Sequence, residues 1–404
     1  MGQAAARRVR QFKPTVFAEM SALSAKYGAV NLGQGFPDFP GPAFVKDAAA
    51  RAIASDANQY AHPAGVPALR EAIAADWAQR HGIDVDPDSQ VTVTSGATEA
   101  IFDAIMALLD PGDAVVAFEP FYDSYPASAA MAGAEFRAVR LEPPAWSYSI
   151  DVLRAAVDDR ARMILLNTPH NPTGKVFSRD ELQEIADLAI ARDLIVVTDE
   201  VYDRITFDGH GHIPIATLPG MWDRTLTVNS TGKTFSLTGW KVGYAVGPAW
   251  LTDALRAVHQ FVTFATSTPF QHAMAEAMTM ANDNDYYQQL AEDYRQRRDV
   301  LTLAVESADL PVLPVQGSYF LQASFDTFGF ETDVEFCRWM ITEVGVTPIP
   351  PSAFYLEPSS APKLVRFCFA KHVATLEEAG RRMAGLRDHA PGTSIRGVGR
   401  MKEK

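Results

Sequence analysis

The sequence predicts an α/β protein built on a mostly parallel sheet, and three observations support this class. Short β-rich runs alternate with helical stretches between about residues 90 and 250, as in chains that form βα units. Several of these runs are apolar throughout, which is typical of strands covered by helices on both faces. The chain has 404 residues, more than a single hydrophobic core comfortably organises, so a second domain is expected.

The alternating runs follow one another in chain order. The expected strands are QVTVT (90–94), AVVAFE (114–119), RMILLN (162–167) and LIVVTDE (194–200), and the expected helices are ATEAIFDAIMALL (97–109), SYPASAAMAG (124–133) and SRDELQEIADLAIARD (178–193). Polar residues stand just past strand ends, at Ser95-Gly96, Asn167, Asp199 and Ser230. Open α/β sheets bind ligands at this edge, so we expect the functional site there.

A different pattern follows the sheet region. Residues 283–307 have the periodicity of a long helix with a charged face. After it, we expect strands in GSYFLQASF (317–325) and KLVRFCFA (363–370), and helices in VEFCRWMITEVG (334–345) and ATLEEAGRRMAGLRDH (374–389). We therefore predict a large domain at 45–290, a smaller α+β domain formed by 1–44 and 291–390 together, and a flexible tail at 391–404.

Composition excludes several classes of protein. The formal net charge is −13, and no sustained Lys/Arg run follows the first ten residues, which argues against a nucleic-acid partner. No apolar run reaches membrane-spanning length, and the basic N-terminal stretch leads into polar residues with no secretory pattern. The two cysteines, Cys337 and Cys368, lie in apolar contexts and are expected to be buried thiols of a reducing compartment. These features predict a cytoplasmic protein with no membrane partner.

The stretch STGKTFSLTGWKVG (230–243) places Lys233 among small and hydroxylic residues. A lysine amine forms a Schiff base with a carbonyl compound once burial or a nearby cation lowers its pKa. Ser230 and Lys241 are suited to a phosphate, one through its hydroxyl and the other as a point charge. The alternative is that Lys233 is a solvated loop lysine.

A nucleotide-binding P-loop is a competing interpretation of Gly232-Lys233-Thr234, and it fails on two counts. The first glycine of that motif would stand at position 227, where the chain has Thr227. The acidic strand at 194–200 also precedes the lysine instead of following it.

Two strand ends supply further candidate groups. The chain breaks at Ser95-Gly96 before a helix, so the amides of Ala97 and Thr98 either form an anion site at a helix N-terminus or belong to an ordinary strand-to-helix turn. Asp199 is either a helix N-cap or a carboxylate aimed out of the sheet, and Tyr202 can reach the same space. Asp199 there could pair with the protonated nitrogen of a pyridine ring.

The prolines in NTPHNPTGKVF (167–177) make a rigid turn that can hold Asn171 in one orientation. His170 in this turn is interpreted as a packing or solvent residue, with catalytic base as the alternative. Arg366 lies within an expected strand, where it either pairs with a protein carboxylate or grips the carboxylate of a ligand. The histidines His62, His259 and His272 lack metal-ligand spacing, and no metal is expected.

Taken together, segments from about residue 13 to 388 resemble the pyridoxal-phosphate (PLP) dependent class I/II aminotransferases. The segments are NLGQGFPDF (31–39), NQY (58–60), EPFYDSY (119–125), NTPHNPTGKVF, TDEVY (198–202) and STGKTFSLTGWKVGY (230–244). The resemblance implies fold type I, in which a large domain with a mostly parallel seven-stranded sheet between helices carries a smaller α+β domain. The chain looks most like the branch of kynurenine, glutamine and methionine aminotransferases, and it is similar to N-succinyldiaminopimelate aminotransferases.

The resemblance also implies roles for individual residues. Lys233 binds the cofactor pyridoxal 5′-phosphate covalently and shuttles the proton, Asp199 pairs with the ring nitrogen, and Tyr202 and Asn171 bond the ring's phenolic oxygen. The remaining cofactor contacts are stacking by Tyr122 and a phosphate site made of Ala97, Thr98, Ser230, Lys241 and, from the partner subunit of a homodimer, Tyr60. The implied substrate contacts are Arg366, Asn171, the backbone of Gly35, and Phe17.

The substrates are an amino acid and a 2-oxo acid, used in a ping-pong reaction. Phe17 stands in place of a tryptophan of kynurenine aminotransferases, which leaves the amino donor open. With Phe36, Tyr125 and Phe264 also expected near the entrance, we predict a bulky, apolar, glutamine-like, methionine-like or kynurenine-like donor. The alternatives are an N-succinyldiaminopimelate aminotransferase, a cysteine-conjugate β-lyase, and a non-enzymatic aminotransferase-like regulatory module.

Overall fold

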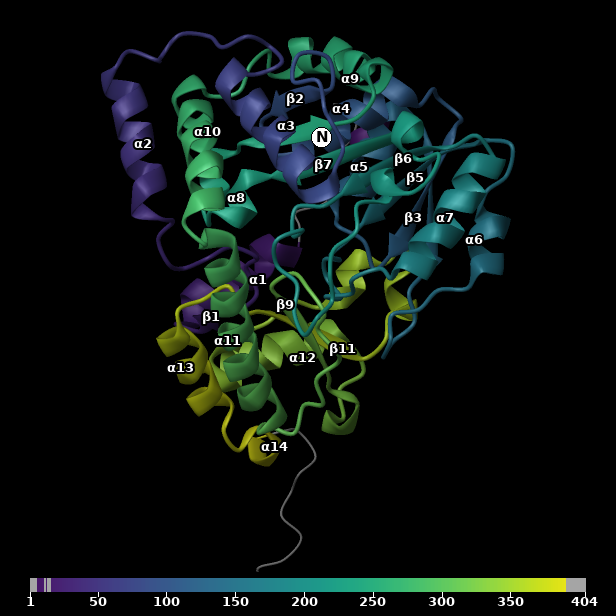
Figure 1. The fold of residues 1–404 in the computed structure, drawn as a ribbon. Helices are drawn as coiled ribbons and strands as arrows, with labels where there is room; N and C mark the ends of the chain where they lie inside the picture. The colour runs from purple at the N-terminus through teal and green to yellow at the C-terminus, as the bar shows by residue number, and fades with distance from the viewer. Residues whose placement is uncertain (1–5, 11, 13–15, 390–404) are drawn as a thin grey trace, which may run out of the picture.

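The structure is a computed structural model that describes residues 6–10, 12 and 16–389 (Figure 1). The flexible tail predicted at 391–404 lies outside these residues. Within them, no helix is long and apolar enough to cross a membrane.

A central sheet has seven strands in the order β2-β8-β7-β6-β5-β3-β4. The strands are β2 (Val91–Thr94), β8 (Gly243–Val246), β7 (Thr225–Ser230), β6 (Ile195–Asp199), β5 (Ala161–Asn167), β3 (Ala114–Glu119) and β4 (Glu135–Arg140). Strand β8 runs antiparallel to β2 and β7, and the other pairs are parallel. The register sets Asn167 at the end of β5 opposite Asp199 at the end of β6, so both residues emerge at one edge.

Helices cover both faces of this sheet, which confirms the prediction from the apolar strands (Figure 1). On β3, Val115 and Ala117 pack in the core with α4 (Ala97–Leu108), α5 (Ser124–Ala132) and α9 (Ala249–Val262). Their neighbours Val116 and Phe118 pack in another core with α6 (Ile150–Ala156) and α7 (Arg179–Ala191). Successive strand residues point to opposite faces, so a strand buried on both sides must be apolar throughout.

Three further helices pack beside β2 and β8. They are α2 (Ala43–Ala54), α3 (Pro67–His81) and α10 (Thr268–Asp283). Short helical segments complete this part of the chain: α8 (Thr231–Thr234), which follows β7, and the 3₁₀ turns Arg7–Val9, Ile215–Thr217, Trp222–Arg224 and Thr238–Trp240.

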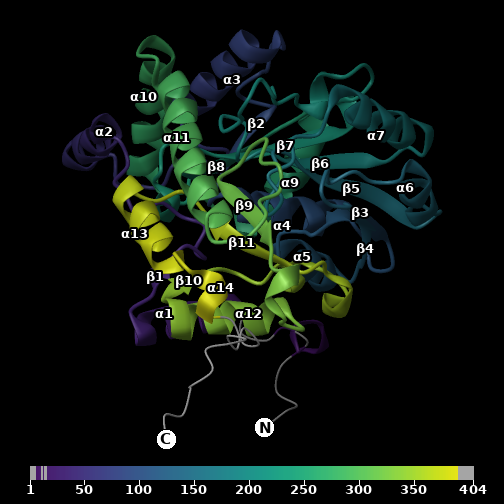
Figure 2. The same ribbon diagram turned by 90° about the horizontal axis from the view of Figure 1, so that it is seen from below.

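The expected long helix is α11 (Tyr286–Glu306), which leads into a second body of structure (Figure 2). That body contains the antiparallel pair β9 (Phe320–Ser324) and β11 (Leu364–Cys368), with the helices α12 (Asp333–Trp339), α13 (Val373–Met383) and α14 (Leu386–His389). The helix expected at 334–345 continues past α12 as a π-helical turn, Met340–Val344. The second body also contains the 3₁₀ turns Asp326–Phe328, Pro351–Phe354 and Pro358–Ser360.

The N-terminal segment joins this second body. Helix α1 (Val16–Tyr27) packs on it, and β1 (Val30–Asn31) pairs in parallel with β10 (Val346–Thr347). One apolar cluster holds residues from both ends of the chain, including Met20, Leu32, Phe336 and Phe367. The domain boundaries at 45 and 290 stay a prediction.

Candidate active site

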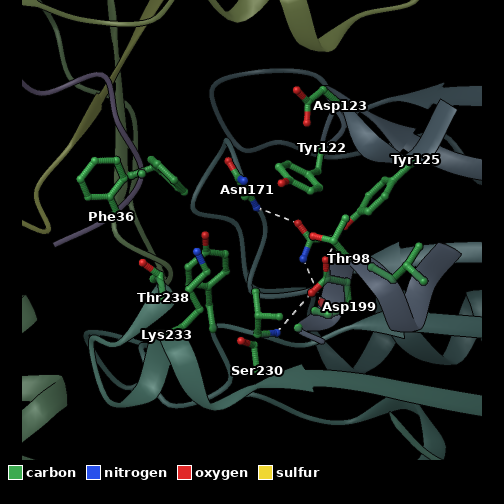
Figure 3. A pocket seen from close by; sticks show the side chains of 18 of the residues that line it. Phe36, Thr98, Tyr122, Asp123, Tyr125, Asn171, Asp199, Ser230, Lys233 and Thr238 are labelled. Carbon is green, nitrogen blue, oxygen red and sulfur yellow. Dashed lines mark hydrogen bonds between the residues drawn. The ribbon is translucent and has the colours of Figure 1, made fainter. Parts of the chain in front are cut away.

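A cavity of about 300 Å³ opens at the carboxyl ends of β5, β6 and β7, where the sheet meets the second body (Figure 3). Every site residue that the sequence predicts lines it, except Tyr60. They are Phe17, Gly35, Ala97, Thr98, Tyr122, Asn171, Asp199, Tyr202, Ser230, Lys233, Lys241 and Arg366. The fold therefore collects into one space side chains that are spread over most of the chain.

Lys233 lies on the single-turn helix α8, directly after β7. Desolvation at this site lowers the pKa of its amine to about 8, so the neutral, nucleophilic form is accessible near neutral pH. Lys233 Nζ donates a hydrogen bond of 2.9 Å to Tyr319 Oη, and Tyr319 in turn donates one of 2.6 Å to the carbonyl of Gly35. The solvated-loop alternative for Lys233 is thus wrong.

Asp199 ends β6 and lies at the bottom of the cavity. Its Oδ2 accepts a hydrogen bond of 2.6 Å from Tyr125 Oη, and its Oδ1 accepts one of 3.3 Å from the Val201 amide. Burial raises its pKa to about 6, although the bond from Tyr125 opposes the rise. A buried carboxylate of this kind is stabilised by a cationic group, and a protonated ring nitrogen supplies one.

The expectation that Tyr125 stands near the entrance is wrong. The Tyr125 side chain is only 2% exposed and packs against Asp199, because α5 turns it toward the strand end. Phe264 does not line the cavity of its own chain, and its ring lies edge-on to that of Tyr60, with centroids 5.4 Å apart. Its place near an entrance stays a prediction. Phe36, in contrast, does line the cavity and is 47% exposed.

The turn before α4 has the features of a phosphate site. The helix begins at Ala97 with Gly96 at the N-cap, and no side chain caps it, so amides of the first turn face the cavity side. Gly96 has φ +77°, and a Cβ there would meet Lys241 Nζ at 3.1 Å, so glycine permits the ammonium to approach. The hydroxyls of Thr98 and Ser230 line the same space.

Arg366 projects from the middle of β11 and is 1% exposed. Its Nη1 donates to Asn171 Oδ1 at 3.1 Å and its Nη2 to the Gly33 carbonyl at 2.9 Å, while its guanidinium lies 4.1 Å from the centroid of the Phe320 ring. Among the described residues it has no ion-pair partner, and its buried Nε has no hydrogen-bond partner. Of the two possibilities left open by the sequence, a protein carboxylate is therefore wrong, and the donor set fits a ligand carboxylate.

Tyr202 is 3% exposed and meets the Tyr319 ring edge-on at a centroid distance of 4.9 Å. Tyr60 lies outside the cavity and is 87% exposed. His170 is buried with Nδ1 2.8 Å from Thr173 Oγ1, and burial lowers its pKa to about 3, which identifies it as a packing residue.

Asn167, which the sequence placed at this edge of the sheet, lines the cavity, and its side-chain amide donates to the Asp199 carbonyl at 2.8 Å. Sequence reasoning missed three other lining or supporting residues: Phe320 lies under Arg366, Asp123 lines the cavity, and Tyr319 accepts from Lys233. Tyr319 had no local signal, because its partner is 86 residues away.

The side chains that line the cavity fit one class of protein. A lysine nucleophile, a buried acid for a ring nitrogen, a phosphate turn and a carboxylate-binding arginine fit pyridoxal 5′-phosphate with an amino acid beside it. Fold and site together define a PLP-dependent transferase of fold type I.

Comparison with known proteins defines the family. Residues 27–383 match the family described as aminotransferase class I and II, so the chain belongs to that family. It is 41% identical to the methionine aminotransferase of Escherichia coli (strain K12), over 94% of this chain and 97% of that protein. It is 44% identical to the probable N-succinyldiaminopimelate aminotransferase DapC of Mycobacterium tuberculosis (94% and 98% covered), and 39% to human kynurenine–oxoglutarate transaminase 1 (93% and 96%).

Solved structures agree with this assignment. The E. coli methionine aminotransferase YbdL superposes with a TM-score of 0.91 at 40% identity, covering 94% of this chain and 99% of that one. The N-succinyldiaminopimelate aminotransferase from M. tuberculosis gives 0.91 at 44% identity, covering 95% and 100%. The protein is a PLP-dependent aminotransferase.

Proposed function

We propose that this aminotransferase takes its amino group from an L-amino acid with an apolar, aromatic or neutral polar side chain, such as methionine, glutamine or kynurenine, and passes it to a 2-oxo acid. One observation carries the proposal: the cations that line the cavity are Lys233, Lys241 and Arg366. Each of the three is assigned here to the cofactor or to the α-carboxylate. Within the described lining, a side-chain carboxylate of the substrate would find no further cation and would face Asp123 instead. Phe17 and Phe36 supply apolar surface.

When bound, PLP supplies an aldehyde that carries the amino group and a ring that withdraws electrons from the substrate's Cα. Arg366, with Asn171 and the segment of Gly35, holds the α-carboxylate of the substrate. Asp199 would keep the proton on the ring nitrogen, Tyr202 and Asn171 would hydrogen-bond the ring oxygen, and Tyr122 would stack on the ring; all four residues line the cavity.

The hydrogen bonds of Tyr319 bear on the proton transfer by Lys233. Because Tyr319 donates its own proton to the Gly35 carbonyl, it accepts one from Lys233 Nζ. The lone pair of the free amine therefore points away from Tyr319 and is available to accept the α-proton of the substrate and return it. Ala97, Thr98, Ser230 and Lys241 bind the phosphate in this scheme.

We also propose that the enzyme is a cytoplasmic homodimer in which Tyr60 reaches the phosphate of the partner's site. Tyr60 does not line the cavity of its own chain, and other exposed apolar side chains accompany it: Phe261 and Val262 are 86% and 50% exposed. Large exposed aromatics of this kind are typical of a covered interface. The buried free thiols Cys337 and Cys368 suit a reducing compartment.

N-succinyldiaminopimelate is the second candidate donor, favoured by the 44% identity to DapC. A β-lyase shares this fold and lysine, and pyruvate and ammonia released without an oxo acid would reveal it. A regulatory module without activity is disfavoured, because each proposed catalytic position is occupied by a competent side chain.

The deciding experiment is a visible-absorption titration of the holoenzyme without any acceptor. Glutamine, methionine, kynurenine and N-succinyldiaminopimelate are added separately, and loss of the lysine-bound cofactor band with the first three supports the proposal. A response to the last alone would instead assign the enzyme to that substrate. Lys233→Ala should abolish turnover and keep the fold, while Lys46→Ala, at an exposed position of α2, should change neither.

A further inference from the structure

A buried cluster of charged side chains lies outside the cavity, between the phosphate turn and the segment that carries Tyr60. It consists of Glu99 and Asp103 on α4 and His259 on α9, which are 9%, 0% and 0% exposed. None of the three lines the cavity, and the proposed reaction does not use them. Burying a charge costs folding free energy unless the charge is paired, so we looked for a function of this cluster.

Hydrogen bonds connect this cluster in two directions. His259 Nε2 lies 3.0 Å from the carbonyl of Pro63, and since a carbonyl can only accept, Nε2 carries a proton and donates it. His259 Nδ1 lies 3.0 Å from Glu99 Oε1 and 3.7 Å from Asp103 Oδ2. The other oxygen of Glu99 accepts a hydrogen bond from the amide of Ser95.

The geometry also defines the protonation state of His259. With Nε2 protonated, a bare Nδ1 would direct its lone pair at two carboxylates, so Nδ1 carries a proton as well. Burial alone lowers the pKa of His259, but the hydrogen bond to Glu99 and the negative charges of Glu99 and Asp103 outweigh it and raise the pKa to about 9. The pKa of Asp103 is also raised, and in this case burial is the cause.

The two ends of this hydrogen-bonded chain are functional segments. Ser95 immediately precedes Gly96 and the amides that face the phosphate, and Pro63 follows Tyr60 by three residues. The carbonyl of His259 additionally accepts from the amides of Thr263 and Phe264, and the Phe264 ring packs against Tyr60. The imidazolium of His259 thus connects the phosphate turn of its own subunit with the segment of Tyr60, the residue proposed to reach the site of the partner subunit.

We propose that His259 is a positioning residue that couples occupation of the phosphate site in one subunit to placement of the Tyr60 that serves the partner's site. The inference rests on the proposed homodimer and deepens it. In this arrangement, phosphate binding orders the Ser95–Thr98 turn, and the Glu99–His259–Pro63 chain transmits that order to the interface segment. Cofactor binding and dimer formation then strengthen each other by the same factor, as linkage requires.

The test measures two constants in wild type and in His259→Gln: the dissociation constant of PLP from the apoprotein, and the dissociation constant of the dimer with and without PLP. Glutamine has no charge and cannot donate to Pro63 and Glu99 in the same geometry. We expect PLP to bind about tenfold more weakly in the variant, as for loss of a charge-assisted hydrogen bond. We also expect PLP to tighten the wild-type dimer and to lose this effect in the variant.

His272→Gln is the matched control, because His272 is an exposed histidine on α10. It should leave both constants and their linkage unchanged. Glu99→Gln keeps the volume and an acceptor for the Ser95 amide, so it tests the same link if His259→Gln does not fold; it should weaken the linkage in the same direction.

Three results would overturn the proposal. Weaker PLP binding with an unchanged effect of PLP on the dimer would assign His259 a merely structural role. A stoichiometric divalent metal in the purified wild type that is lost in His259→Gln would show that a metal ion, and not a protonated His259, holds the cluster together. A wild-type protein that binds PLP as a monomer would remove the coupling and leave the aminotransferase function standing, whereas failure to bind PLP at all would count against the function itself.

Discussion

Replacing Tyr125 by phenylalanine removes one oxygen atom from the bottom of the cavity and leaves the ring in place. The lost contact is the 2.6 Å hydrogen bond to Asp199 Oδ2, between two side chains that are 2% and 5% exposed. A hydrogen bond to a charged group contributes about 1.5–3 kcal/mol to the charged state. Because 1.36 kcal/mol corresponds to one pH unit, we expect the pKa of Asp199 to rise from about 6 by a further one to two pH units, roughly.

The direction of this change determines its effect on catalysis. A carboxyl with a raised pKa is neutral below that pKa, and only the charged form pairs with a protonated ring nitrogen. In Tyr125→Phe the charged form is lost over a wider acidic range, so kcat/KM at pH 7 should fall by about twofold to tenfold, and by more at lower pH. The acidic limb of the pH profile should move to higher pH by the same one to two units, roughly.

The assay is kcat/KM for a glutamine donor from about pH 5.5 to about pH 9, a range that includes the expected acidic limb, together with the PLP dissociation constant of the apoprotein. Tyr122→Phe is the matched control. It also removes one phenolic hydroxyl, on the neighbouring turn, but it leaves the hydroxyl of Tyr125 that donates to Asp199. Equal losses in both variants, or an acidic limb that does not move in Tyr125→Phe, would refute the proposed dependence of the Asp199 charge on Tyr125.

Three further predictions follow from the same site. Arg366→Lys replaces a planar fork by a point charge, so KM for every amino donor should rise about tenfold or more while the visible spectrum of the bound cofactor stays the same; an unchanged KM would contradict the carboxylate role. The rate at which PLP reconstitutes the apoprotein, followed by stopped-flow absorbance, should rise with pH and level off above about 8, since the lowered pKa of Lys233 means that the nucleophilic neutral amine dominates there; a limb near the ordinary value of 10.5 would contradict it. Gly243→Ala places a Cβ 2.5 Å from the carbonyl carbon of Gly96, so it should cost about 1–3 kcal/mol of stability and loosen PLP, whereas Gly239→Ala, with no atom within 4 Å of its Cβ, should melt and bind like wild type in thermal-shift and dialysis measurements.

Much of the fold was predictable because it depends on neighbours in the chain. The alternating apolar runs become β3, β5 and β6, and the long charged helix is found as α11. The turn at the start of α4 was predictable for the same reason, since a strand that breaks at Ser95-Gly96 and starts a helix at once exposes amides whatever the rest of the molecule does. That this turn binds a phosphate stays a prediction.

What the sequence by itself determined is therefore the set of chemical groups and the elements that carry them: the lysine after β7, the acid at the end of β6, the arginine in β11 and the family to which they belong. Only the tertiary structure decided what each group meets. Asp199 accepts from Tyr125, 74 residues away, Lys233 donates to Tyr319, 86 residues away, and His259 joins Glu99, 160 residues away. Periodicity and turn chemistry act over a few residues, whereas these contacts arise from the packing of separate elements, which is also what sets burial and, through burial, the pKa of each group.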